Sequence, residues 1–132
     1  MPLLFLVAFS VPMLSEHLTL NLNEGSVAFH FTPQAAQNLQ AAIADLMHTL
    51  KVNAAKPPSA SAGGSRAGQQ PPMEYRYTGD VFLELFCNPN IWSSPFAAKV
   101  LLTLRDDRIR VTTEIALSQL QEDLNQYLEQ TR

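Results

Sequence analysis

The chain has 132 residues, an apolar fraction of 46% and a formal net charge of −3 at pH 7. This length suits one domain with one modest core, and the ordinary apolar fraction excludes general disorder. A mildly acidic chain repels phosphate backbones, so nucleic-acid binding is disfavoured unless a local basic patch supplies the attraction.

The chain begins with an apolar arm over residues 1–14, whose centre is the uninterrupted apolar run 3–9. This run is too short to cross a bilayer, which needs about 20 apolar residues, and it lacks the basic start of a signal peptide. We therefore expect no membrane insertion. Two interpretations stay open: an arm that packs against the fold, or translation that begins at Met13.

A β-hairpin and a helix are expected next. Apolar and polar residues alternate over 18–22 and 27–31, with Gly25 in the turn between them, which is the pattern of a hairpin. Thr32 followed by Pro33 supplies a helix cap and a first helical position. One buried stripe follows at helical spacing, formed by Leu39, Ile43, Leu46, Met47 and Leu50.

The stretch Lys56–Pro72 is rich in proline, glycine, serine and alanine and has no large apolar side chain. Such a segment cannot bury enough surface to offset the entropy of ordering its backbone. We predict that the helix ends near Lys51 and that residues 53–73 form a disordered internal linker. Because neither flank is equipped to fold alone, the chain is expected to be a single domain over 1–132.

Strands and a second helix are predicted after the linker. The expected strands are 74–77, 80–87, 97–104 and 109–117. A capping box of Ser118 and Gln121 predicts the start of the last helix, with an apolar face of Leu120, Leu124 and Leu128 and a polar face of Glu122, Asp123 and Gln126. Helices after antiparallel strands hide their stripes on a sheet. The predicted fold is therefore α+β, a single antiparallel β-sheet with two helices packed on one face, interrupted by a disordered loop.

No catalytic or metal-binding pattern emerges from the sequence. The three histidines are 13 and 18 residues apart, which matches no compact ligand set. Asp80 and Glu84 share a strand face, but a glycosidase-like pair needs a cleft that the pattern does not provide. Glu84 is instead expected to face solvent or pair with an arginine on the next strand. No nucleophile elbow or phosphate-binding loop occurs, so we expect neither enzymatic activity, nor a cofactor, nor a metal.

Cys87 is the single cysteine, which rules out an intramolecular disulfide and a cysteine metal cluster. It lacks a nearby cationic residue and is expected to be a structural thiol. A reducing, cytoplasmic compartment fits this composition best.

Protein binding is the favoured function. The strand over 80–87 is apolar on one face, yet its other face carries Phe82 and Phe86, where a sheet covered on one side should be polar. Aromatic patches of this kind mark interfaces. The predicted partner-binding residues are Phe82, Glu84, Phe86, Trp92 and Phe96. Intramolecular cover by the arm or a helix is the open alternative, and a homodimer is one form of the interface.

A second hypothesis is a single-stranded nucleic-acid platform. Tyr75, Arg76 and Tyr77 could combine stacking with phosphate contacts from the arginines over 105–110. Acidic neighbours stand beside these residues, including Glu74 and Asp80. Nucleic acid is therefore the disfavoured partner.

Two stretches resemble small cyanobacterial accessory proteins. They are 110–129, RVTTEIALSQLQEDLNQYLE, and 82–90, FLELFCNPN. The resemblance covers about a quarter of the chain. It implies a small accessory factor, such as an adaptor or assembly chaperone for a photosynthetic or carboxysome complex.

Overall fold

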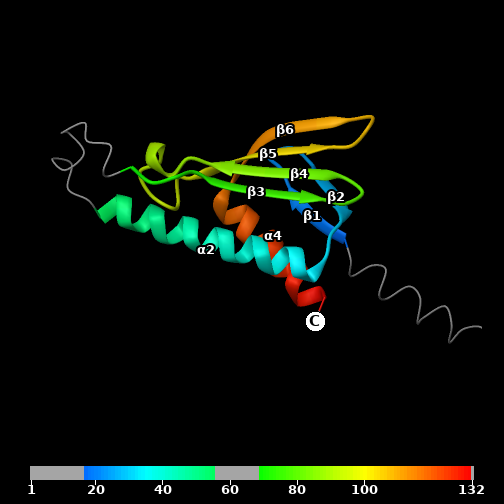
Figure 1. Cartoon of the computed structure of the whole chain (residues 1–132), viewed down its shortest axis with the longest axis horizontal. Coiled ribbons are helices and arrows are strands. Elements are labelled where there is room, and N and C mark those ends of the chain that lie inside the picture. Colours follow the sequence, from blue (N-terminus) through cyan, green and yellow to red (C-terminus); the bar gives the residue numbers. More distant parts are fainter. Residues whose placement is uncertain (1–16, 56–68, 132) are drawn as a thin grey trace, which may run out of the picture.

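The computed structural model describes residues 17–55 and 69–131. Its elements follow one another as a hairpin, a long helix, four strands with a short 3-10 turn among them, and a final helix (Figure 1). Their bounds are β1 His17–Asn21, β2 Ser26–His30, α2 Pro33–Ala55, β3 Met73–Thr78, β4 Phe82–Cys87, η2 Pro89–Ile91, β5 Lys99–Arg105, β6 Arg110–Ala116 and α4 Leu117–Gln130. The α+β class is confirmed.

The expectation of a single sheet is wrong. The described strands form two antiparallel sheets, a two-stranded one of β1 and β2 and a four-stranded one in the order β3-β4-β5-β6. β1 is bonded to α4 and not to a strand of the larger sheet. The backbone N–H of Asn21 donates to Asp123 Oδ2 at 2.8 Å, and its side-chain Nδ2 donates to Oδ1 at 2.7 Å.

The polarity of Asp123 predicted that it would lie on the solvent-facing side of α4. That prediction is wrong. The Asp123 side chain is 3% exposed and also accepts a hydrogen bond of 2.9 Å from Gln119 Nε2. A buried carboxylate is tolerated when donors surround it in this way. This residue fastens the hairpin to the last helix.

The core lies on one side of the four-stranded sheet, which we call the inner face. Alternate side chains of the strands point to it, and they meet α2, α4 and the hairpin there (Figure 1). Phe31 joins these parts, because its ring lies 4.8 Å from that of Tyr77 on β3 and 5.7 Å from that of Tyr127 on α4. Both helices thus cover the same face, as predicted.

One of the two predicted helix caps is confirmed. Thr32 Oγ1 accepts a hydrogen bond from the backbone N–H of Ala35 at 3.0 Å, and α2 begins at Pro33. The capping box at Ser118 is wrong, because α4 starts directly after β6, with Ala116 at its cap and no side-chain hydrogen bond there. The N–H of Leu117 bonds Ala98 O at 3.1 Å, which fixes this abrupt start.

The helix before the linker is longer than predicted and continues to Ala55. Asn53 Nδ2 donates to Pro89 O at 3.3 Å, which holds the last turn against η2. The predicted arm over 1–14 and most of the predicted linker lie outside the described residues. Among the helices of the described ranges, none has the length and apolar character that a bilayer crossing requires.

Candidate functional site

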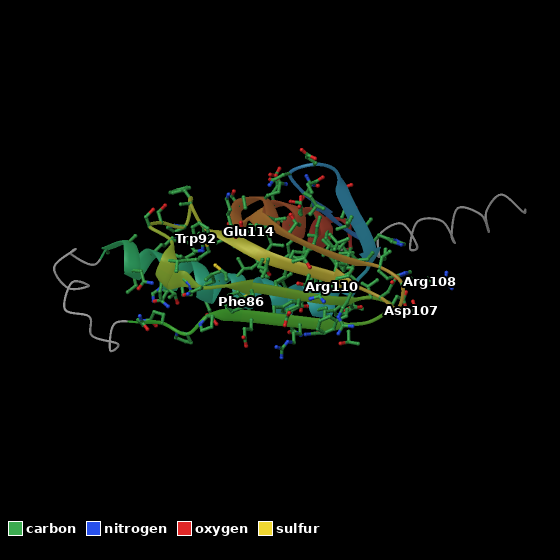
Figure 2. All side chains as sticks on the ribbon, turned by 90° about the horizontal axis from the view of Figure 1, so that it is seen from above. Phe86, Trp92, Asp107, Arg108, Arg110 and Glu114 are labelled. Atoms are coloured by element: carbon green, nitrogen blue, oxygen red, sulfur yellow. The ribbon has the colours of Figure 1, made fainter. Side chains whose placement is uncertain are left out.

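The candidate site is the outer face of the four-stranded sheet, opposite the face that packs on the helices. Strand pairing places its side chains in three rows that cross all four strands. The described helices and the hairpin all contact the inner side, so none of them covers this face (Figure 2). The rows are Thr78–Phe82–Arg105–Arg110, Arg76–Glu84–Thr103–Thr112 and Glu74–Phe86–Leu101–Glu114.

An ion pair occupies the middle row. Arg76 Nε donates to Glu84 Oε2 at 2.8 Å, so Glu84 pairs with an arginine, although this arginine is on the preceding strand β3 and not on the next one. The hydrogen bond and charge of Glu84, together with the charge of Glu74, raise the pKa of Arg76. Because Arg76 is largely exposed, this pair orders the surface more than it stabilises the fold.

An aromatic ring lies on each side of this ion pair. Phe82 is opposite Arg105, whose guanidinium carbon is 4.4 Å from the ring centroid, a cation–π contact. Phe86 is opposite Leu101, which remains 40% exposed. The two phenylalanines are half-buried, so each presents a flat apolar surface in a fixed position.

Charge is distributed unevenly along the strands of this face. The row through Phe82 carries two arginines, Arg105 and Arg110, whereas the row through Phe86 carries two glutamates, Glu74 and Glu114. Figure 2 shows Arg110 near the β5–β6 turn and Glu114 further along β6. The row through Phe82 is therefore basic and the row through Phe86 is acidic. Exposed Lys99 lies beyond the acidic row, two residues before Leu101 on the same side of β5.

The structure divides the five predicted binding residues. Phe82, Glu84 and Phe86 lie together on the outer face. Trp92 follows η2 and packs against the core. Phe96 is 93% exposed in the turn that leads to β5. These two aromatics lie in loops, where no strand period fixes the direction of a side chain.

Leu101 and Arg105 complete the outer face. Leu101 is not among the predicted site residues, and Arg105 is predicted only for the alternative nucleic-acid platform. Leu101 stands between Val100 and Leu102 in an unbroken apolar run, so alternation of polarity could not assign its side. Arg105 lies one residue beyond the predicted strand 97–104, yet it is the last residue of β5. Aligning the predicted strands in register would have revealed both.

Tyr75 and Tyr77, the tyrosines of the predicted nucleic-acid platform, point to the core. They do not lie on the side of the sheet that carries the arginines. The Tyr75 hydroxyl donates to Ala35 O at 3.1 Å, and burial, followed by the neighbouring Tyr77, raises the pKa of Tyr75 to about 12. Tyr77 packs on Phe31. Arg76 points to the outer face, so the predicted stacking set is split between two sides of the sheet.

Two of the three histidines lie side by side, next to an aspartate. His17 and His30 are cross-strand neighbours with ring centroids 4.5 Å apart, and His30 Nδ1 lies 3.7 Å from Asp80 Oδ2. His48 is exposed on α2. Over residues 17–55 and 69–131, no three histidine, cysteine, aspartate or glutamate side chains gather as metal ligands would.

Comparison with known proteins finds no matching family, no matching curated protein and no matching solved structure. The function of the chain therefore has to be argued from the outer face itself.

Proposed function

We propose that the protein is a non-enzymatic adaptor or assembly factor that binds a protein or peptide partner on the outer face of its four-stranded sheet. The observation that carries the proposal is the pair of neighbours Phe86 and Leu101 on adjacent central strands, on a face that no described element covers. An assembly role in a photosynthetic or carboxysome complex, as the sequence resemblance implies, is one form of this function.

The physical argument rests on what such a face normally contains. An antiparallel sheet that packs on helices with one face usually exposes polar side chains on the other. Here the two central strands contribute Phe82, Phe86 and Leu101 instead. Aromatic anchors contribute most of the binding energy at interfaces, and their positions are fixed by the strands that hold them.

The charges indicate the chemistry of the partner. A segment that places an acidic group near Arg105 and Arg110, apolar groups over the two rings and a basic group near Glu114 would complement the rows of Phe82 and Phe86. Complementary charge of this kind mainly sets orientation and association rate, and the apolar contacts supply affinity.

A matched pair of substitutions tests the proposal. Leu101 on the outer face is 40% exposed and Val52 on α2 is 39% exposed, so Leu101→Gln and Val52→Gln remove similar apolar surface from two different places. The full-length chain and both variants are immobilised, and the proteins retained from a native lysate are identified by mass spectrometry.

We expect Leu101→Gln to lose at least one protein that Val52→Gln and the wild type retain, while circular dichroism shows all three folded. Equal retention by the three would contradict the proposal. Salt-sensitive binding of single-stranded oligonucleotides that Leu101→Gln abolishes would assign the same face to nucleic acid.

A further inference from the structure

The free edge of β6 offers a second binding feature, distinct from the outer face. β6 is the last strand of the four-stranded sheet, and Figure 1 shows no described element beyond it, whereas α2 runs alongside β3 at the opposite edge. An uncovered edge strand presents unpaired N–H and C=O groups to any chain that can pair with it.

Two hydrogen bonds at the ends of the β5–β6 ladder show which residues of β6 direct their backbone N–H and C=O groups to β5 and which direct them to the free edge. Leu117 N–H bonds Ala98 O, and Asp106 N–H bonds Ile109 O. Both lie in the β5–β6 register, so the odd-numbered residues of β6 bond β5. The even-numbered residues Arg110, Thr112, Glu114 and Ala116 consequently direct their backbone groups to the free edge.

The side chains on this edge form a self-complementary pattern. Arg110 and Glu114 are exposed and stand two residues on either side of Thr112. Within the described ranges neither has an ion pair or a side-chain hydrogen bond. Arg110 is directly opposite Arg105 instead, a like-charge cross-strand pair that costs free energy.

We propose that two copies of this chain pair through β6, antiparallel and centred on Thr112, to form a dimer with one continuous sheet. A two-fold axis at Thr112 places Arg110 of each copy opposite Glu114 of the other. It also brings Ile109, which is 67% exposed, opposite the second copy's Ile115 on the inner side. Each copy then places opposite Arg110 and Glu114 of the other a counter-charge that neither residue has opposite it within its own sheet.

Other registers fit less well. The edge-directed residues must face one another, so the axis moves in whole-residue steps along β6. An axis at Arg110 or Glu114 opposes like charges, and an axis at Thr113 leaves Glu114 opposite Thr112. The β3 edge also alternates Glu74 and Arg76, but Arg76 is already bonded to Glu84 within the sheet.

This dimer goes beyond the proposed partner binding and does not depend on it. It would place two outer faces side by side on one surface. If the chain dimerises but captures no partner, the dimer proposal holds and the partner proposal fails. If the chain captures a partner while it remains a monomer, the partner proposal holds and the dimer proposal fails.

Charge reversal tests the register. By analytical ultracentrifugation over a concentration series, wild type is expected to dimerise, and Glu114→Arg or Arg110→Glu alone to raise the dimer Kd about thirtyfold, because both symmetric contacts turn repulsive. The double variant R110E/E114R should restore the dimer. An equimolar mixture of the two single variants should form a heterodimer, because each supplies what the other needs.

Glu74→Arg on the opposite edge strand is the matched control and should leave the dimer unchanged. A wild type that stays monomeric up to its solubility limit would overturn the inference. So would a dimer that Glu114→Arg leaves intact, since that dimer would use another surface.

An oxidation experiment gives an independent readout of the axis. Thr112→Cys should form a disulfide-linked dimer, because the two Cα atoms of a hydrogen-bonded pair lie about 5.5 Å apart, within disulfide range. The native Cys87 is 1% exposed and does not compete. Thr78→Cys on the β3 edge should still dimerise through β6 but should form no disulfide-linked dimer, and equal crosslinking of both variants would contradict the β6 pairing.

Discussion

The burial of Cys87 makes the stability of the fold depend on pH. The Cys87 side chain is 1% exposed on the inner face. Burial raises the pKa of the thiol to about 11, although the indole of Trp92 partly offsets the rise. The unfolded thiol loses its proton near pH 9, so between about pH 9 and 11 the folded chain binds a proton that the unfolded chain does not.

The predicted consequence is a loss of stability as pH rises through this window. The free energy of unfolding should fall by about 2 kcal/mol between pH 9 and 11 from this residue, because the unfolded state binds fewer protons there. Urea unfolding of wild type and Cys87→Ala at several pH values measures it. The difference in unfolding free energy between the two proteins should become smaller as the pH rises. If the two free energies instead fall in parallel with pH, the thiol does not cause the loss of stability.

At the scale of elements, the attachment of the hairpin to α4 depends on one carboxylate. Asp123→Asn replaces an acceptor of three hydrogen bonds with an amide whose NH₂ group faces the donors Asn21 and Gln119. We expect the unfolding free energy to fall by about 2 kcal/mol, since hydrogen bonds to a charged acceptor are lost. Urea denaturation measures the change, with the exposed neighbour Glu122→Gln as control. Similar losses in both variants would refute the role of Asp123.

The sequence predicts most elements because local chemistry decides them. Period-2 alternation located the hairpin and the last strand, and Thr32 with Pro33 located the start of α2. The Ser118 cap failed because a tertiary bond, from Leu117 N–H to Ala98 O, starts α4 earlier. The second sheet also could not be foreseen, because the bonds from Asn21 to Asp123 join residues far apart in the chain.

The same division between local and tertiary causes applies to the candidate site. The period-2 spacing of a strand alone predicts that Phe82, Glu84 and Phe86 share one face. Trp92 and Phe96 follow no such period, and their loops direct one into the core and the other to solvent. Leu101 belongs to the patch through strand register, which depends on pairing rather than on its own neighbours.

At the scale of the whole molecule, both flanks of the linker are fastened to one short loop. Asn53, near the end of α2, donates to Pro89 O. Gln70, just before β3, exchanges two hydrogen bonds with Asn90, its N–H donating at 3.0 Å and its carbonyl accepting at 2.8 Å. Because Pro89 and Asn90 are adjacent, the two flanks meet at the same place, and the connection between them does not need its natural length.

Replacing residues 56–68 with about six glycine and serine residues should therefore leave the fold intact, since such a linker is flexible and easily spans neighbouring points. Loop-closure entropy changes slowly with length, so the free energy of unfolding should stay within about 1 kcal/mol of wild type. Urea unfolding measures this. Asn90→Ala in the shortened chain is the matched comparison, because it releases one anchor and should destabilise the fold. If shortening alone abolishes cooperative unfolding, residues 56–68 contribute contacts to the native structure and are more than a connection.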